Sequence, residues 1–287
     1  MYAVMGVTGK VGGAVAAGLL ESGCGVRAIV RDASKAHTWT QQGCEIALAN
    51  VEDADALSAA FQDVEGVFVM LPPVFDPRLG FPEAKTAIAA LTQSLKRAAP
   101  PKIVCLSTIG AEAEQPNLLN QLGLLEQALQ PLPAPIVFLR AAWFLDNAAF
   151  DAASARSTGV IESFLQPLDK QYPMVAAKDV GCVAAELLRD TWHGHRVVEL
   201  EGPRRVTPNE IAQAFAAALG RPVAARVVQR QDWEKVFRSG GMQNPTPRIQ
   251  MLDGFNQGWI QFSDGGRQAR HATTTAEQVI ASIVDSV

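Results

Sequence analysis

The stretch Gly6-Val7-Thr8-Gly9-Lys10-Val11-Gly12 decides the fold, because it joins a strand-like segment, Tyr2–Val7, to a helical one, Val11–Glu21. In the pattern G-x-x-G-x-x-G, one glycine makes a tight turn and the next lets a diphosphate approach the backbone. The last allows close contact between helix and strand. Free N–H groups at the start of the helix then bind phosphate. The stretch therefore predicts a turn that binds the diphosphate of a dinucleotide.

Outward from this turn, strand-like and helical segments alternate through residues 1–140. The expected strands are Tyr2–Val7, Val26–Val30, Glu45–Leu48, Gly66–Leu71, Ile103–Leu106 and Ile136–Leu139. The expected helices are Val11–Glu21, Ala33–Gln42, Asp53–Gln62, Pro82–Arg97 and Leu118–Gln130. Such alternation predicts βαβ units with right-handed crossovers. We expect an α/β fold, a doubly wound parallel sheet of the Rossmann type, with the dinucleotide at the carboxyl ends of its strands.

The alternation changes after residue 140, and residues 141–287 predict a smaller C-terminal α/β lobe on the substrate side, interleaved with the end of the sheet. Its expected elements are helix Lys178–Arg189, strand Arg196–Leu200, helix Pro208–Leu219, strand Val223–Val228, a helical Trp233–Phe237 and a mostly helical tail, Arg248–Val287. Thr207 is the expected N-cap of the helix that begins at Pro208, and Gly220 its C-terminal stop.

The end of the second strand bears on the choice of cofactor. Arg31 follows this strand, with Asp32 next to it and Lys35 close by. An acidic residue there binds the ribose 2′-hydroxyl of NAD, whereas an arginine accommodates the 2′-phosphate of NADP. Arg31 and Lys35 favour NADP(H), and Asp32 keeps NAD(H) open as the less favoured alternative.

Composition narrows the class of protein. Of 287 residues, 48% are hydrophobic, the net charge is −4, and no basic stripe is visible, so nucleic acid is not an expected partner. No apolar run approaches the roughly 20 residues that cross a bilayer, and no export signal precedes the first strand, so we expect a cytoplasmic protein without a membrane contact. The four cysteines form no C-x-x-C pair, and His193 and His195 are expected in a surface turn, so no metal site is predicted.

Further segments resemble the NmrA-like branch of the atypical short-chain dehydrogenases/reductases. Besides the phosphate turn and Val30-Arg31-Asp32, these are Val67–Pro73, Leu106–Ala111, Arg140–Asn147, Lys178-Asp179-Val180 and Glu201-Gly202-Pro203, so the resemblance covers residues 1–228. It implies a cleft between a Rossmann domain and a small lobe. The residues expected to contact the cofactor are Gly6, Thr8, Gly9, Lys10, Val11, Gly12, Arg31, Lys35, Asn50, Val51, Leu71, Pro72, Ser107 and Thr108. Asn50 stands where the family often has an aspartate near the adenine.

The chain departs from the family of classical reductases at the proton donor. Those enzymes use Tyr-x-x-x-Lys, but neither Tyr2 nor Tyr172 has a lysine four residues later. Alignment on Ser107 and Glu126 places Leu118 and Leu122 at the two positions, within a predicted apolar helix stripe that continues through Leu125 and Leu129.

The catalytic residues therefore stay open. Ser107 is a candidate to hydrogen-bond a substrate carbonyl, or it serves only its own loop, and Asn147 is a candidate polar contact in the cleft. Trp143, Phe144, Trp233, Phe255 and Trp259 are candidates to line an apolar cleft, with core packing as the alternative for each.

Two functions follow from these observations. The first is an NADPH-dependent reductase of a quinone-like small molecule, since the anion formed from a quinone tolerates the absence of a protein acid better than an alkoxide does. The second is a non-catalytic NADP(H) sensor that acts through a protein partner. The sequence predicts neither the substrate nor the oligomeric state.

Overall fold

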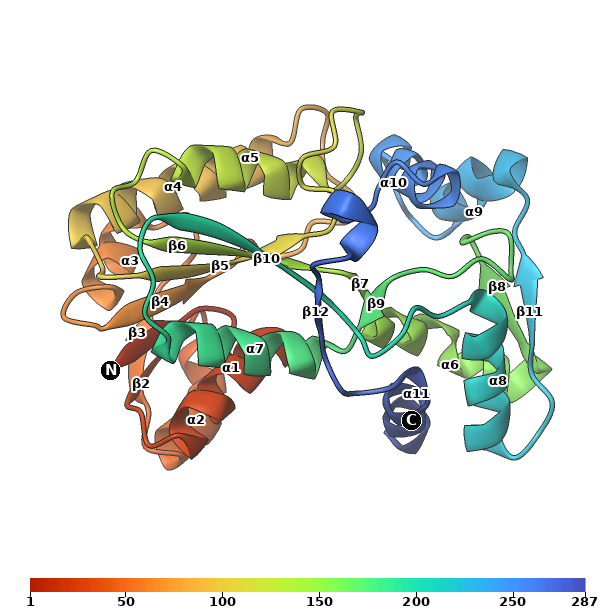
Figure 1. Ribbon diagram of the computed structural model, residues 1–287, viewed down its shortest axis with the longest axis horizontal. Coiled ribbons are helices and arrows are strands. Elements are labelled where there is room, and N and C mark those ends of the chain that lie inside the picture. The colour runs from red at the N-terminus through yellow and green to blue at the C-terminus, as the bar shows by residue number, and fades with distance from the viewer. Residues whose placement is uncertain (287) are drawn as a thin grey trace.

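The computed structural model describes residues 1–286, and its centre is a sheet of eight parallel strands (Figure 1). The strands are β1 (Tyr2–Val4), β2 (Val26–Val30), β3 (Glu45–Leu48), β4 (Gly66–Val69), β5 (Ile103–Thr108), β6 (Ile136–Ala141), β10 (His195–Glu201) and β12 (Arg270–His271). Their order, β3-β2-β1-β4-β5-β6-β10-β12, reverses direction between β1 and β4. The predicted doubly wound Rossmann sheet is confirmed, and that reversal is where such sheets bind dinucleotides.

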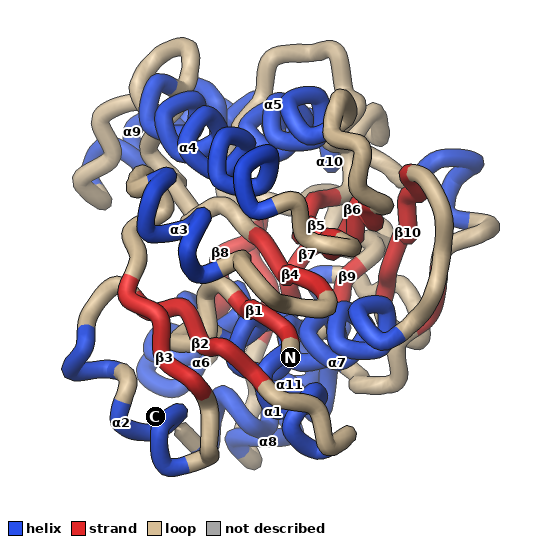
Figure 2. Tube along the Cα trace, turned by 90° about the vertical axis from the view of Figure 1, so that its left-hand side faces the viewer, coloured by secondary structure: helices blue, strands red, loops and turns tan. Residues whose placement is uncertain are grey.

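Helices cover both faces of the sheet (Figures 1 and 2). One layer holds α1 (Lys10–Glu21), α2 (His37–Gln41) and α7 (Ala177–Arg189), and the other holds α3 (Ala54–Ala60), α4 (Pro82–Ala98) and α5 (Asn120–Leu129). Successive strand residues face opposite layers. Thus Val4 and Phe68 pack with the layer of α1, whereas Ala3 and Cys105 pack with the layer of α4.

A smaller lobe lies beyond the carboxyl ends of the strands, on the right of Figure 1. Two short parallel pairs, β7 (Trp143–Phe144) with β9 (Met174–Val175) and β8 (Val160–Ser163) with β11 (Ala224–Val227), run through it. Its helices are α6 (Ala152–Thr158), α8 (Pro208–Leu219), α9 (Trp233–Ser239), α10 (Thr246–Gln257) and α11 (Ala276–Asp285). Short 3-10 segments are η1 (Ala33–Lys35), η2 (Leu145–Asp151), η3 (Arg230–Asp232) and η4 (Ser263–Gly266). The chain returns from this lobe to the main sheet twice, through β10 and through β12.

The C-terminal tail is less helical than predicted. Only α10 and α11 are long helices, while residues 258–275 contain η4 and β12, and Val287 lies outside the described residues. Buried acids on the body hold this stretch: Glu199 accepts the N–H of Ser263 at 2.9 Å, and Asp179 accepts the N–H and hydroxyl of Thr274 at 2.9 and 2.7 Å. Because these partners are 64 and 95 residues apart, local periodicity does not reveal them.

The helix expected at Ala33–Gln42 is also wrong in part, because it divides into η1 and α2, with Asp32 capping η1. The strand β1 ends at Val4, before the turn that Gly6 makes with a φ of +70°. Thr207 and Gly220 bound α8 as expected, the first in a full capping box and the second in the left-handed region. His193 is exposed in the loop before β10, whereas His195 begins β10 and is half-buried, so the surface turn expected for both is wrong for His195.

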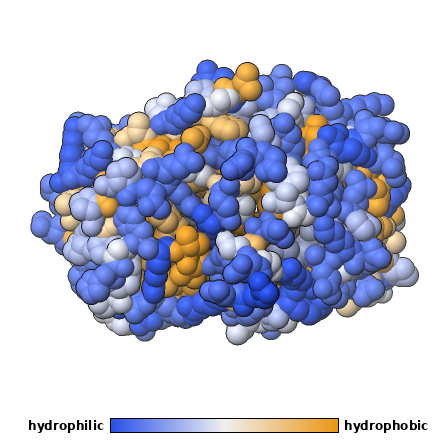
Figure 3. Space-filling view, turned by 45° about the horizontal axis from the view of Figure 1, so that its top comes forward, coloured by the Kyte–Doolittle hydropathy of each residue, from blue (hydrophilic) through white to orange (hydrophobic). Residues whose placement is uncertain are grey.

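The surface in Figure 3 is predominantly hydrophilic, with scattered apolar patches. Large apolar side chains that are exposed among residues 1–286 are Met1, Leu48, Phe75, Leu79, Phe150 and Val197. In the same range, no helix combines the length and the apolar character needed to cross a bilayer.

Candidate cofactor and substrate site

The phosphate turn follows β1 at the carboxyl edge of the sheet. The N–H of Gly9 donates to the carbonyl of Gly6 at 2.9 Å, which closes the turn, and α1 begins at Lys10. A Cβ on Gly12 would lie 2.3 Å from the Gly6 carbonyl oxygen and 2.5 Å from that of Met5. Gly12 is therefore the position at which helix and strand touch.

Gly9 has the opposite environment. It is exposed, its backbone is extended, and a Cβ there would meet only the Gly6 carbonyl oxygen, at 3.4 Å. No side chain among residues 1–286 caps α1. Its first N–H groups, which helix geometry leaves without an intrahelical partner, therefore have no side-chain cap. This donor set and the missing side chain fit a dinucleotide diphosphate.

At the end of β2, Arg31 and Lys35 are exposed, and the side chain of neither has a hydrogen bond or ion pair within residues 1–286. Asp32 instead accepts the N–H of Ser34 at 2.9 Å. This hydrogen bond, reinforced by the Ser34 hydroxyl and the charge of Lys35, lowers the pKa of Asp32. The Asp32 carboxylate is thus engaged as a helix cap, while the Arg31 guanidinium is free to meet a ligand.

Lys10 connects the turn to the lobe. Its ammonium donates to Oδ1 of Asp146 at 2.7 Å, and Oδ2 of Asp146 accepts the N–H of Ala177 at 2.7 Å. Asp146 therefore ties the phosphate turn to the N-terminus of α7. Sequence reasoning missed Asp146, because 136 residues separate it from Lys10.

Ser107 is buried at the end of β5, and its hydroxyl donates to Glu126 of α5. Arg140 binds both oxygens of Glu126, at 2.9 and 2.8 Å, and pairs with Glu112 at 2.6 Å. Burial lowers the pKa of Arg140, but these two carboxylates raise it more. Ser107 is thus bound to a buried ion pair beneath the strand ends, whereas Thr108, one residue on, is half-buried.

Leu118 and Leu122, which alignment places at the Tyr and Lys positions of the dyad, both pack against other parts of the protein. Leu118 precedes α5, which corrects the predicted helix start, and its N–H donates to the Pro247 carbonyl of α10 at 2.9 Å. Leu118 packs in the core shared with the lobe, whereas Leu125 and Leu129 pack in the opposite core, so the four leucines are not one stripe. Leu122 is half-buried.

Tyr172 is buried within the lobe. Its hydroxyl lies 2.8 Å from the carbonyl oxygen of Gln166 and 3.0 Å from Oδ1 of Asn256, and burial raises its pKa to about 12. A phenol held in this way is a structural group.

Half-buried aromatic side chains adjoin the carboxyl end of β6. Trp143 and Phe144 follow this strand after Ala142, and the ring of Phe255 meets that of Trp143 edge-on, with centroids 5.2 Å apart. Phe255 is 3% exposed and lies behind Trp143, while Trp233 is fully buried and belongs to the core. Asn147 is half-buried in η2, three residues after Phe144.

The remaining expected contacts also lie at strand ends. Asn50 follows β3 and lines a polar hollow of about 560 Å³ with residues of α3 and α4, while Val51 is buried. Leu71 and Pro72 follow β4, the first buried and the second half-buried. A second hollow, of about 400 Å³, lies between the loop after β5 and Trp259. The carboxyl edge of the sheet thus gathers the predicted residues, with the turn and the aromatic pair on either side of β4 and β5.

Comparison with known proteins agrees with this arrangement. The model of the NmrA-like family matches residues 2–256. The chain belongs to the NmrA-like family. The resemblance inferred from sequence is confirmed.

Among individual proteins, the chain is 29% identical over 244 residues to an NAD(P)H azoreductase of Xenophilus azovorans, covering 84% of this chain and 82% of that one. Its fold is similar to that of an NADPH-dependent quinone oxidoreductase of Escherichia coli complexed with NADPH (TM-score 0.81, 23% identity, 99% of each chain). It is also similar to that of a Citrobacter triphenylmethane reductase complexed with NADP(H) (TM-score 0.79, 21% identity, 98% of this chain and 99% of that one).

Proposed function

We propose that this protein is an NADPH-dependent reductase of quinone-like aromatic acceptors. The observation that carries the proposal is the placement of the open phosphate turn and the half-buried Trp143 at one edge of the sheet. A Rossmann sheet binds a dinucleotide across this edge, with its two halves on either side of the strand reversal. The family, and the similarity to reductases of azo dyes, quinones and triphenylmethane dyes, support the same activity.

In this proposal, the N-terminus of α1 binds the diphosphate, and Arg31 with Lys35 binds the 2′-phosphate. NADPH supplies a hydride to the acceptor. Trp143 provides an apolar plane against which an aromatic acceptor stacks. The opposite face of the Trp143 ring packs against the protein, which excludes water on that side. The protein thereby contributes mainly proximity and orientation.

The absence of a protein acid favours quinones over simple ketones. Hydride transfer to a ketone leaves an alkoxide, which needs a proton at once, whereas a reduced quinone is a phenolate-like anion whose conjugate acid has a pKa near 10, as for tyrosine. Alignment on Ser107 and Glu126 places Leu118 and Leu122 at the dyad positions, and Ser107 already donates to Glu126. The quinone product can take its proton from water.

The role of Trp143 is tested by NADPH consumption with 1,4-naphthoquinone as acceptor. We expect Trp143→Ala to lower kcat/KM about tenfold with NADPH affinity unchanged. Phe150→Ala is a matched control, because Phe150 is an 81% exposed aromatic residue of the neighbouring η2. An equal effect of both substitutions would contradict the stacking role of Trp143.

A non-catalytic NADP(H) sensor is the second candidate, favoured by the leucines that alignment places at the dyad positions. It predicts tight NADPH binding without consumption of NADPH by any quinone or dye, and a protein partner whose binding depends on the redox state of the cofactor.

A further inference from the structure

Trp143, after the end of β6, and the Phe255 ring that packs against it are held in place by a closed series of contacts. The N–H of Trp143 donates to the Pro173 carbonyl at 3.2 Å, where β7 meets β9. Tyr172, the neighbour of Pro173, reaches Oδ1 of Asn256 through its hydroxyl at 3.0 Å. Asn256 follows Phe255, whose ring returns to Trp143. The backbone of Trp143 and the ring that supports it are therefore fixed to the same side chain, Asn256.

Asn256 has every polar atom of its side chain engaged. Oδ1 accepts the N–H of Gln166 at 3.0 Å as well as facing the Tyr172 hydroxyl, and Nδ2 donates to the Phe164 carbonyl at 2.9 Å. These partners lie 84 to 92 residues earlier in the chain. Asn256 thus fastens the last turn of α10 to the loop after β8. The network is partly buried, and a polar network in which each member is satisfied selects one arrangement of its surroundings.

Lys170 holds the same turn of α10 from the backbone side. Its ammonium donates to the carbonyls of Phe255 and Asn256, at 2.8 and 2.7 Å, which satisfies two groups that a helix C-terminus leaves unpaired. The same ammonium lies 5.3 Å from the centroid of the Tyr172 ring. Both the side chain and the backbone at the end of α10 are therefore fixed, which leaves the Phe255 ring little freedom.

We propose that Asn256 is a positioning residue for the acceptor: by fixing Phe255 behind Trp143, it sets how large a planar ring system the site accepts. This inference rests on the proposed function. A single-ring acceptor needs little of the Trp143 plane, whereas a fused two-ring acceptor must lie along it. Loosening the support behind Trp143 therefore weakens binding of the larger acceptor more than that of the smaller one.

The test compares 1,4-naphthoquinone with 1,4-benzoquinone in the full-length Asn256→Ala variant. We expect KM for naphthoquinone to rise about tenfold and KM for benzoquinone to change by about twofold or less. Both kcat values and the NADPH dissociation constant stay within about twofold of wild type. Phe255→Leu, which keeps the polar network and removes only the ring edge, is expected to show the same split and decides the matter if Asn256→Ala does not fold.

Leu129→Ala is the control for lost stability, since Leu129 is buried in the other core, on the far face of the sheet. An equal rise in KM for both acceptors, or the same split in Leu129→Ala, would overturn the proposal. Calorimetric titration of the NADP⁺ complex with each quinone gives a readout without turnover. If wild type binds naphthoquinone and does not reduce it, the proposed function fails while the positioning role is still decided by the variants. If wild type does not bind naphthoquinone, the positioning role fails too.

Discussion

Gly9 and Gly12 have different roles in the phosphate turn, and the substitutions Gly9→Val and Gly12→Ala separate them. Gly9 has extended backbone and space for a side chain, whereas Gly12 is in contact with the carbonyls of Met5 and Gly6. We expect Gly9→Val to keep the melting temperature of wild type and to lower NADPH affinity at least about tenfold, because its methyl groups occupy the place of the diphosphate.

Gly12→Ala should instead lower the free energy of unfolding by about 1–3 kcal/mol through overpacking. Calorimetric titration with NADPH and thermal unfolding check both; full NADPH affinity in Gly9→Val would exclude this turn as the diphosphate site.

We propose that Arg31 governs the choice between the two nicotinamide cofactors. A charged hydrogen bond to phosphate contributes about 1.5–3 kcal/mol, so Arg31→Ala should weaken NADPH binding about tenfold to a hundredfold. NADH lacks the 2′-phosphate, and its dissociation constant should barely change. Asp32→Ala is a useful companion, because Asp32 caps η1 and should affect both cofactors equally. Equal losses for NADPH and NADH in Arg31→Ala would show that the guanidinium does not meet the 2′-phosphate.

At this scale, residues whose role depends on local backbone could be predicted. The turn glycines and the N-cap Thr207 belong to this group. Asp146 and Asn256 could not be predicted, because each acts through partners more than 30 residues away that only the fold brings near.

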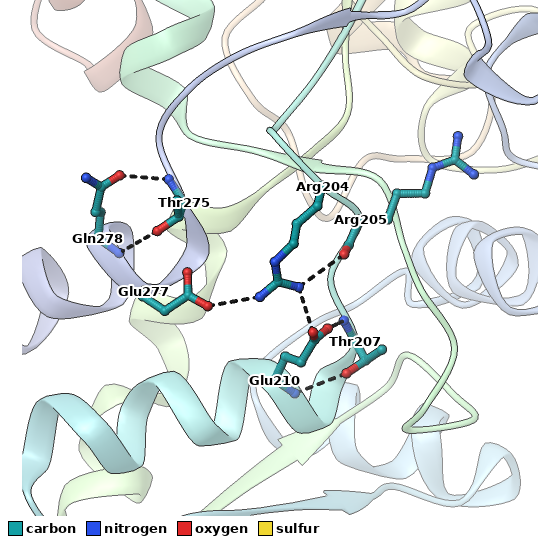
Figure 4. Close-up of polar contacts among 7 residues, drawn as sticks. All are labelled: Arg204, Arg205, Thr207, Glu210, Thr275, Glu277 and Gln278. Atoms are coloured by element: carbon teal, nitrogen blue, oxygen red, sulfur yellow. Dashed lines mark hydrogen bonds and ion pairs between the residues drawn. The ribbon is translucent and has the colours of Figure 1, made fainter.

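At the scale of elements, one arginine of the lobe joins the N-termini of two helices, α8 and α11 (Figure 4). Arg204 pairs with Glu210 of the α8 capping box at 2.6 Å and with Glu277 in the first turn of α11 at 2.9 Å. Partial burial raises the pKa of Glu210, but the N–H and hydroxyl of Thr207 and the Arg204 guanidinium outweigh it and lower the pKa overall. The pKa of Glu277 is lowered first by its own backbone N–H, then by the Thr275 hydroxyl and by Arg204.

Arg204→Ala should therefore destabilise the protein modestly and in a pH-dependent way. Exposed ion pairs contribute about 0.2–1 kcal/mol each, so the melting temperature at pH 7 should fall by about 2–4 °C. Carboxylates with lowered folded-state pKa values stabilise above their unfolded value of about 4.5, and this contribution is lost as the pH falls through the folded-state pKa. The difference between variant and wild type should accordingly shrink below pH 4. A difference that is constant from pH 7 to pH 3.5 would show that packing, not charge, joins the two helices.

Elements with a strong local period were predictable. The boundaries of β2, β3 and α8 agree with the sequence analysis residue for residue. The start of α5 and the strand β12 were not predictable, because Leu118 is held by Pro247 and β12 is completed by its neighbour β10. In both cases a partner distant in sequence outweighs the local pattern.

For the whole molecule, two separate parts of the chain form one candidate site. The phosphate turn comes from the N-terminal half of the sheet, and the aromatic pair comes from the crossing into the lobe and from α10. The sequence analysis named both sets of residues as candidates, but the series of contacts behind Trp143 became visible only in three dimensions. Tyr172, the second of the two tyrosines in the sequence, takes part in this series of contacts as a buried hydrogen-bond donor.

This arrangement predicts a reductase without a tyrosine acid. Tyr172→Phe should leave the quinone rate within about twofold of wild type, since Phe164 and Gln166 still hold Asn256. The pH profile of that rate should lack a step that the substitution removes. Loss of activity in Tyr172→Phe with an unchanged melting temperature would contradict the structural role of the phenol.

The most direct test of the central claim is the consumption of NADPH by the wild-type protein with 1,4-naphthoquinone and with cyclohexanone at pH 7. General acid catalysis contributes about 10²–10⁴-fold, so the account predicts turnover of the quinone and a kcat/KM for the ketone lower by at least about that factor. Comparable turnover of the ketone would mean that a proton donor acts in the cleft. Tight NADPH binding with no turnover of either acceptor would contradict the reductase and support the sensor.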